Sequence, residues 1–374
     1  MSNTYDAIVI GGGVIGGSIA YNLAKRGSKV LLLEKDRLAS KSSGAAAGML
    51  GAQAEMDGVG SLFQLAKKSR GMFPTLANEI KEKTGIDIDL INKGMLKICL
   101  NDQDQQENKR IITTQRQNGE EAEWLTGSEI RKKEPAVSEA ITGAMYLEKD
   151  GHVDATQLTL GFLKSATVLG VVIKEYVEVH SFKFSNGKVT GIETNEGHFT
   201  SDKIIVAGGA WSNKILAETG LQLDTYPVKG ECFSVVIQQP LLSSTIFSHG
   251  CYLVPKKGGR IIVGATVIPR TFNQQVTVEG ISLLMEKAKY LVPSIVEAEW
   301  ERAWAGIRPQ TADGLPYLGE HPIYKGLFVA TGHFRNGILL SPITGEVIAD
   351  LVEGKEPPLN LSPFRVERMV KQYT

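Results

Sequence analysis

The pattern of apolar and polar positions at the start of the chain predicts a strand, a helix and a second strand. Residues 6–10 read Asp-Ala-Ile-Val-Ile, a glycine-rich turn and an apolar helix follow, and residues 30–34 read Val-Leu-Leu-Leu-Glu. Short, uninterrupted apolar runs are typical of strands buried on both faces, as in parallel sheets. We therefore expect a β-α-β unit within the first 34 residues.

Apolar positions at helical spacing predict further helices along the chain. These helices are expected over residues 61–84, 154–169, 278–291 and 337–351, and residues 101–135, which are charged and rich in glutamine, are expected to form a solvated helical region. Asp154 precedes the second of these helices, so its side chain is expected to cap the helix N-terminus.

Runs of apolar and β-branched residues between glycine, proline or asparagine predict strands. They lie within residues 87–100, 171–173, 177–179, 189–193, 226–268, 300–308 and 326–332, and residues 203–212 read as a buried strand, a glycine turn and a helix. The order is thus the β-α-β unit, an inserted β-rich segment, a return strand, a second β-rich segment, and a return strand with a helix. This order predicts two interleaved domains rather than two consecutive ones.

Composition and charge narrow the class of protein. The chain has 374 residues, enough for two or three domains, and 42% of them are hydrophobic, so a large core is available. Lys+Arg and Asp+Glu are both 41, a balance that gives no support for nucleic acid or an anionic membrane as partner. Cys99, Cys232 and Cys251 form no C-x-x-C pair and the six histidines are scattered, so neither a disulfide framework nor a metal site is expected.

The apolar stretch over residues 7–24 resembles a signal or membrane segment only in its hydrophobicity. Asp6 precedes it, no basic stretch stands before it, and five glycines interrupt it. We expect a soluble, cytoplasmic protein.

Candidate chemistry begins with the glycines of this stretch. Gly11, Gly13 and Gly16 have the G-x-G-x-x-G spacing, and Glu34 lies eighteen residues after the last of them. In dinucleotide-binding units such glycines permit a tight turn, close approach to a pyrophosphate and close helix packing, and the acid binds a ribose. The helix N-terminus favours phosphates. A β-α-β unit whose glycines serve packing alone is the alternative, and the motif does not separate NAD from FAD.

Two further segments carry candidate binding groups. Residues 38–50 combine small side chains and hydroxyls directly after the ribose-binding strand, which favours contact with a ligand over a flexible loop. Residues 330–340 read as a buried strand, a glycine and a polar cluster before a helix. Ligands bind at such strand ends in open α/β sheets.

With these segments in place, the chain resembles the superfamily of FAD-dependent amino-acid oxidases, which includes D-amino-acid oxidase, sarcosine oxidase and glycine oxidase. It is most similar to the bacterial glycine oxidases of thiamine biosynthesis. The resemblance covers essentially the whole chain and implies FAD rather than NAD. Besides the N-terminal motif it rests on Ser43–Leu50, Pro227–Cys232, Cys251–Pro255, Gly306–Pro309 and Gly332–Leu339.

The resemblance implies an α/β (α+β) fold in which a Rossmann-like FAD-binding domain is interleaved with a β-rich substrate-binding domain. The FAD-binding domain is expected over residues 1–88, 150–222 and 302–374. The substrate-binding domain is expected over residues 89–149 and 223–301. A homotetramer is implied by the resemblance alone.

The resemblance also assigns each cofactor-binding residue to a part of FAD. Besides Gly11, Gly13 and Gly16, the implied residues are Val14, Ile15, Glu34, Lys35, Ser42 and Ser43 for the adenosine and pyrophosphate, Val177 for the adenine end, Ala47, Gly48 and Met49 along the flavin, and His333, Phe334, Arg335, Asn336, Gly337, Ile338 and Leu339 around the isoalloxazine ring.

The substrate residues implied are Arg308, Tyr252 and Arg335. A guanidinium group matches a carboxylate in bidentate geometry, and a tyrosine hydroxyl adds a donor. Taken without the resemblance, Arg308 reads as a structural ion-pair residue and Tyr252 as a strand aromatic.

Some positions depart from the family pattern. Gln53 and Gly250 stand where the pattern has histidines, and Val267 where it has a methionine near the pocket, which bears on substrate range and pocket volume. No cysteine follows Cys251, whereas monomeric sarcosine oxidases attach flavin to a later cysteine. We therefore expect non-covalent FAD.

The implied activity is oxidation of glycine and other small amines that carry a carboxylate, by hydride transfer to flavin N5. The imino acid gives glyoxylate and ammonia, dioxygen is reduced to hydrogen peroxide, and a thiazole-synthesising partner is expected to capture the imine. The alternatives are a sarcosine or D-amino-acid oxidase, an FAD dehydrogenase with a non-oxygen acceptor, and a flavoprotein that uses FAD structurally.

Overall fold

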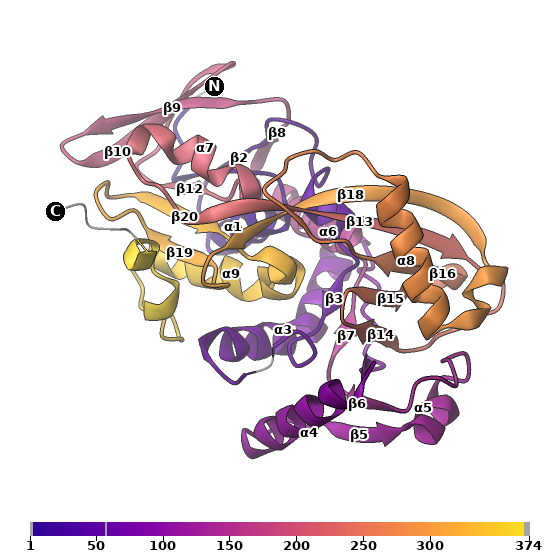
Figure 1. Cartoon of the computed structure of the whole chain (residues 1–374). Helices are drawn as coiled ribbons and strands as arrows, with labels where there is room; N and C mark the ends of the chain where they lie inside the picture. The colour runs from indigo at the N-terminus through magenta and orange to yellow at the C-terminus, as the bar shows by residue number, and fades with distance from the viewer. Residues whose placement is uncertain (1–2, 57, 370–374) are drawn as a thin grey trace.

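The structure is a computed structural model that describes residues 3–56 and 58–369. The outermost parts of the predicted FAD-binding domain, residues 1–2 and 370–374, lie outside the described residues. Figure 1 shows a helix-rich part and a β-rich part, joined by two long strands that run side by side across the middle of the molecule.

The first part is built on a six-stranded sheet whose central strands are parallel. The strand order is β19 (Tyr317–Glu320), β20 (Leu327–Thr331), β12 (Ile204–Val206), β1 (Ala7–Ile10), β2 (Val30–Leu33) and β8 (Val172–Lys174). Only β19 pairs antiparallel with its neighbour. The expected β-α-β unit at the start of the chain is confirmed, with β1 and β2 in parallel register.

Both faces of this sheet are covered, and the alternation of side chains along β1 shows how. Ala7 and Val9 belong to one hydrophobic cluster, which they share with the surrounding helices. Ile8 and Ile10 belong to another, which they share with a three-stranded antiparallel sheet. The helices are α1 (Val14–Lys25), α3 (Ser61–Thr84), α6 (Ala155–Val168) and α9 (Gly337–Val352), and the covering strands are β9 (Val179–Ser185), β10 (Lys188–Thr194) and β11 (Gly197–Thr200). Burial on both faces explains why β1 and β2 are apolar throughout.

The second part is a nine-stranded, mostly antiparallel sheet. Along its main path run β17 (Ile268–Pro269), β13 (Thr225–Val236), β16 (Arg260–Gly264), β15 (Cys251–Pro255), β14 (Thr245–Ser248), β4 (Met95–Ile98), β6 (Gly143–Leu147) and β5 (Glu123–Thr126), and β18 (Glu299–Thr311) pairs with β13. Helices α8 (Val278–Leu291), α4 (Asp102–Gln117) and α5 (Gly127–Lys133) pack beside it. Short elements α2 (Ser42–Ala45), β3 (Met49–Leu50), β7 (Gly151–His152) and α7 (Ser212–Leu216) lie elsewhere along the chain.

The long amphipathic helices are the predictions that the structure confirms most closely. Helices α3 and α8 have the expected bounds, and α6 begins one residue after Asp154, whose side chain accepts a hydrogen bond from the Gln157 N–H at 2.8 Å. Each presents one apolar face to a core, so its periodicity is strong. Within the described residues, no helix is both long and apolar enough to cross a bilayer.

Two predictions of local structure were wrong. The region over residues 101–135 is not a solvated helical region throughout, because β5 pairs there with β6 and Ile111 and Ile112 are buried. Val177 precedes its strand, since β9 begins at Val179. The predicted domain boundaries stay a prediction; β18, which runs through residue 302, belongs to the nine-stranded sheet along its length.

Candidate cofactor and substrate cavity

The glycine loop between β1 and α1 has a backbone that admits no side chain at two positions. Gly11 has φ +119°, and an added Cβ would lie 2.5 Å from the Ala207 carbonyl oxygen. At Gly16 an added Cβ would lie 1.9 Å from the Gly11 carbonyl oxygen, so helix and loop touch backbone to backbone. The first turn of α1 contains no acidic residue. The positive end of the α1 dipole therefore faces the loop with no acidic side chain to oppose an anion there.

Glu34 follows β2 and fixes the same loop. Its carboxylate accepts hydrogen bonds from the Gly12 N–H at 2.8 Å and from the Asp36 N–H at 2.9 Å. Ser43 acts similarly, because its hydroxyl oxygen accepts a hydrogen bond from the Val14 N–H at 2.9 Å. Binding of a ribose by Glu34 stays a prediction, and the structure adds this role in holding the loop.

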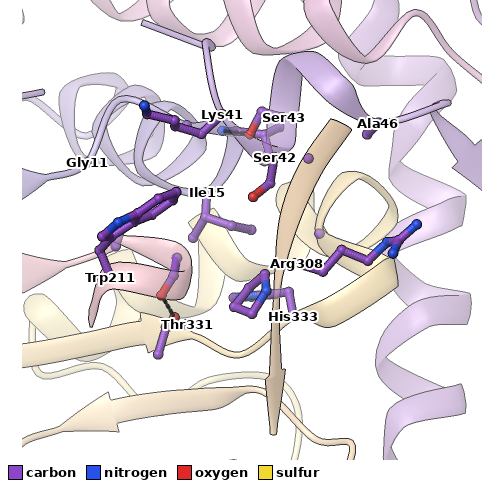
Figure 2. A pocket seen from close by; sticks show the side chains of 18 of the residues that line it. Gly11, Ile15, Lys41, Ser42, Ser43, Ala46, Trp211, Arg308, Thr331 and His333 are labelled. Atoms are coloured by element: carbon purple, nitrogen blue, oxygen red, sulfur yellow. Dashed lines mark hydrogen bonds between the residues drawn. The ribbon is translucent and has the colours of Figure 1, made fainter. Parts of the chain in front are cut away.

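The loop opens into a cavity of about 510 Å³ that extends between the two sheets. Figure 2 shows Lys41 and Trp211 on one side of this cavity and Arg308, carried by β18, on the other. The predicted site residues that line it are Gly11, Gly13, Val14, Ile15, Glu34, Lys35, Ser42, Ser43, Ala47, Gly48, Met49, Val177, Tyr252, Arg308, His333, Phe334, Arg335, Gly337 and Ile338. A cavity of this size is typical of small-molecule and cofactor sites.

Three predicted cofactor residues do not line the cavity. Gly16 lies against the Gly11 backbone, and the Asn336 N–H donates to the His333 carbonyl within a turn. Leu339 is buried in the hydrophobic core, where its carbonyl oxygen accepts a hydrogen bond from the Ser69 hydroxyl at 2.6 Å. A helix turns about 100° per residue, so a run of consecutive residues cannot all face one ligand.

The segment between β20 and α9 lines the cavity with an uncharged histidine. His333 is buried, its Nε2 lies 3.1 Å from the Thr344 hydroxyl, and burial lowers the pKa of His333 to about 3. Its ring is therefore neutral at physiological pH. Beside it, α9 begins at Gly337, so this end of the cavity also faces a helix N-terminus.

Gly230 leaves room for the Arg308 guanidinium, and Gly306, two residues before Arg308, leaves room for Ala45. An added Cβ on Gly230 would lie 2.2 Å from the Arg308 Nη2, and one on Gly306 would lie 2.6 Å from the Ala45 Cβ. The Arg308 Nη1 donates to the Thr266 carbonyl oxygen at 3.2 Å. A guanidinium has several N–H donors in a fixed plane, so donors remain for a ligand in the cavity.

Tyr252 lies near Arg308 on β15 and can donate to a ligand. Its hydroxyl lies 3.5 Å from the Cys232 sulfur, and burial raises the pKa of Tyr252 well above its usual value. The phenol is therefore protonated. Arg335 also lines the cavity, with its guanidinium carbon 5.6 Å from the centre of the Phe334 ring.

The sequence reasoning missed several cavity residues, of which Glu55 is the most unusual. Its side chain is half-buried in the cavity wall, and desolvation raises the pKa of Glu55 to about 7 against the opposing charges of Arg335 and Arg308. Lys41 and Trp211 were also missed; the Lys41 ammonium lies 5.7 Å from the Trp211 ring centre. Trp211 follows a glycine turn at a strand end, a signal that could have marked it, whereas nothing in the local sequence marks Glu55.

The positions that depart from the family pattern do not line the cavity. Gln53 is fully buried, and its amide donates to the Gln115 side chain at 3.0 Å. Gly250 adopts φ +75° in the turn between β14 and β15, and Val267 is half exposed. Cys99, Cys232 and Cys251 are all buried, and none is in a disulfide. Among residues 3–56 and 58–369, no group of His, Cys, Asp and Glu has a metal-binding arrangement.

Comparison with known proteins shows what this arrangement resembles. A family model described as FAD dependent oxidoreductase (DAO) matches residues 6–351. A glycine oxidase of Geobacillus kaustophilus (strain HTA426) is 46% identical over 99% of this chain and 98% of the relative. A crystal structure of glycine oxidase from Geobacillus kaustophilus superposes with a TM-score of 0.96 at 46% identity, covering 98% of this chain and 100% of the other. The protein named bifunctional protein ThiO/ThiG in Nostoc sp. (strain PCC 7120 / SAG 25.82 / UTEX 2576) is 34% identical over 99% of this chain and 56% of its own length.

Proposed function

The chain belongs to the family of FAD dependent oxidoreductases, and from this premise we propose that it oxidises glycine and other small amines that carry a carboxylate, such as sarcosine and small D-amino acids. The observation that carries the proposal is the presence of Arg308 and Tyr252 in the same cavity as the glycine loop. The 46% identity to a glycine oxidase over nearly the whole chain supports the choice of substrate.

FAD, the cofactor of this family, is compatible with the residues of the cavity. Gly11 and Gly16 leave no room for a Cβ, the first turn of α1 carries no acidic side chain, and Gly48, with φ +83°, lies backbone to backbone against Val153. Because these glycines have no side chain, the backbone can lie directly against a pyrophosphate and a flat ring system. When bound, FAD supplies a two-electron acceptor.

We assign the holding of FAD to residues of the loop, of the segment after β2 and of the segment after β20. These are Gly11, Gly13, Val14, Ile15, Glu34, Lys35, Ser42, Ser43, Ala47, Gly48, Met49, Val177, His333, Phe334, Gly337 and Ile338. The association is non-covalent, since no cysteine follows Cys251 in the chain.

Arg308 and Tyr252 hold the substrate carboxylate and so orient the α-carbon for oxidation. A planar guanidinium fixes both the position and the direction of a carboxylate, and a protonated phenol adds a directed donor. Fixing the reacting carbon in this way is a main source of rate acceleration in such reactions. Arg335 lies at the same end of the cavity and adds positive charge there.

The product side of the proposal has three parts. Dioxygen accepts the electrons and gives hydrogen peroxide, water converts the imino acid to glyoxylate and ammonia, and a thiazole synthase is a candidate to receive the imine before hydrolysis. The ThiO/ThiG name of a relative whose length this chain covers by 56% supports such a hand-off. A homotetramer in the cytoplasm completes the proposal.

The visible spectrum of the purified protein, before and after anaerobic addition of glycine, tests this function. We expect oxidised flavin bands that glycine bleaches and that return with oxygen and peroxide. Bleaching by sarcosine or a D-amino acid but not by glycine would change the substrate. Bleaching without peroxide under air would indicate a dehydrogenase, and bands that no amine bleaches would refute amine oxidation.

A further inference from the structure

Glu55 lies in the cavity and has no part in holding the carboxylate. It follows β3 in a short turn, where its N–H donates to the Gly51 carbonyl oxygen at 3.1 Å. Its carboxyl is close enough to Arg308 and Arg335 for both positive charges to act on its ionisation. An acidic side chain therefore stands at the same end of the cavity as the two arginines.

The other acidic residues that line the cavity are engaged at its opposite end. Glu34 binds backbone N–H groups of the glycine loop, Asp36 lies 3.0 Å from the Lys41 ammonium, and Glu178 lies 3.8 Å from the Lys214 ammonium. Among the acidic residues that line the cavity in the described part of the chain, Glu55 alone faces the arginine end.

A buried ion pair fixes the turn that carries Glu55. The Asp150 carboxylate is fully buried and accepts hydrogen bonds from the backbone N–H groups of Gln53 at 3.0 Å and Ala54 at 2.9 Å. Arg70 donates to Asp150 at 2.5 Å and to Glu120 at 2.8 Å. The backbone N–H groups of the two residues immediately before Glu55 are thus hydrogen-bonded to a buried, charged network, which fixes the start of the turn that carries Glu55.

The chemistry of the substrate gives this carboxyl a task. Glycine in neutral water carries an ammonium group, which has no lone pair. Oxidation removes a hydride from the adjacent carbon to the electron acceptor, and the nitrogen lone pair then forms the second bond of C=N. A proton must therefore leave the ammonium first. In glycine the ammonium is only two bonds from the carboxylate carbon, so a carboxylate on Arg308 places the ammonium at the arginine end of the cavity, which Glu55 also lines.

We propose that Glu55 receives the ammonium proton of the substrate and that Arg70 and Asp150 position it to do so. In this step one N–H bond breaks, its electron pair stays on the nitrogen, and an O–H bond forms on the Glu55 carboxylate. The substrate becomes a neutral amine whose carboxylate stays on Arg308. The proposal rests on the proposed function, which supplies the substrate and the electron acceptor.

The electrostatic surroundings of Glu55 suit a proton acceptor at neutral pH. Burial raises its pKa to about 7, Arg335, Arg308 and Lys97 favour the carboxylate, and the negative charge of Asp150 opposes it. Tyr252 also lies near Glu55 and stays protonated, because burial raises the pKa of Tyr252. A base whose pKa lies near the working pH is both available as the carboxylate and able to hold a proton.

The pH dependence of kcat/KM for glycine in the holoenzyme, compared between the wild type and Glu55→Gln, tests the proposal. In the wild type we expect kcat/KM to rise with pH through about 7 and then to level off. In Glu55→Gln we expect about a 100-fold loss at pH 7, with a rise that continues toward the pKa of the free amine. Flavin content and the spectral response to acetate, a carboxylate without an amine, should not fall, because neither needs the proton acceptor.

Glu82→Gln, on the exposed surface of α3, is the matched control and should follow the wild type. The same pH profile in Glu55→Gln and the wild type would overturn the inference while leaving glycine oxidation intact. A wild type that does not bleach with glycine would instead refute the proposed function.

A measurement on the wild type alone covers the case in which Glu55→Gln does not fold. An N-substituted glycine with a less basic amine should give the same rise through about 7, since that ionisation belongs to the enzyme. A rise that moves with the basicity of the amine would overturn the assignment to Glu55.

Discussion

The two ends of the cavity are built in different ways. The nucleotide end is centred on the glycine loop near the start of the chain, and the loop packs through its backbone, as in the approach of Gly16 to Gly11. The arginine end is made by charged and hydroxyl side chains, Glu55, Tyr252 and Arg308, which come from three segments spread between residues 55 and 308. A site made by local backbone leaves a spacing in the sequence, whereas a site made by distant side chains leaves none.

The two ends also depend on different physical terms. At the nucleotide end the requirement is steric, because a single added methyl group would overlap a carbonyl oxygen. At the arginine end the requirement is electrostatic, because buried charges are tolerated only with partners. If this comparison holds, substitutions at one end should change cofactor binding and those at the other should change substrate turnover.

Removal of the Arg308 guanidinium should give the largest effect. We expect Arg308→Ala to lower kcat/KM for glycine by about 1,000-fold, mostly through KM, because a desolvated charge pair with the carboxylate is lost. Flavin content should be unchanged. Steady-state kinetics with a flavin-to-protein ratio checks both, and Arg302→Ala, an exposed arginine on the same strand, should behave as the wild type.

The Arg308→Ala variant should also change the pH dependence of kcat/KM at the arginine end. Arg308 favours the ionised form of Glu55, so its removal should move the rise in kcat/KM to higher pH than in the wild type. Loss of FAD together with activity would contradict the division, since it would make Arg308 a structural residue of the nucleotide end.

The buried support of Glu55 should give the next largest effect. Asp150→Asn keeps the shape of the side chain but leaves Arg70 with less compensating charge, so we expect unfolding to become easier by about 3 kcal/mol. Turnover of glycine should also fall, because the turn before Glu55 loses a strong acceptor. Denaturant unfolding and steady-state kinetics measure the two effects.

The matched control for Asp150→Asn is an exposed ion pair from the same region. Glu121 is 66% exposed and lies 3.4 Å from the Lys149 ammonium. Glu121→Gln should change stability by no more than about 0.5 kcal/mol. Equal losses of stability in the two variants would show that the buried network contributes no more to the free energy of unfolding than the exposed pair does.

The features that could be predicted from the sequence also differ between the two ends of the cavity. The β-α-β unit, the glycine loop and α3 were predicted because spacing and periodicity are local properties, and each has the expected place in the structure. Arg308 and Tyr252 were expected at the site through a family resemblance, not through spacing. Glu55 was missed, since its burial and its arginine neighbours exist only after the two sheets come together. Leu339 was misplaced because a motif that is continuous in sequence alternates between cavity and core once it is helical.

The smallest effect on stability is expected at the nucleotide end, where a substitution tests whether the two ends act independently. In Gly16→Ala the new methyl group would lie 1.9 Å from the Gly11 carbonyl oxygen, so the loop must move away from the helix. We expect a cost of about 2 kcal/mol in unfolding free energy and a lower affinity for FAD, measured by flavin release and rebinding. With FAD in excess, KM for glycine should return to the wild-type value, because the arginine end is untouched.

Gly71→Ala is the control that separates the backbone requirement from the loss of any glycine. Gly71 lies in α3 with no atom within 4 Å of an added Cβ, so alanine should stabilise the helix by about 0.5–1 kcal/mol and leave FAD bound. A KM that stays high in Gly16→Ala at saturating FAD would show that the loop also shapes the arginine end. A change at the nucleotide end would then alter substrate binding at the arginine end. The two ends would differ in how they are encoded in the sequence, but their binding free energies would be coupled.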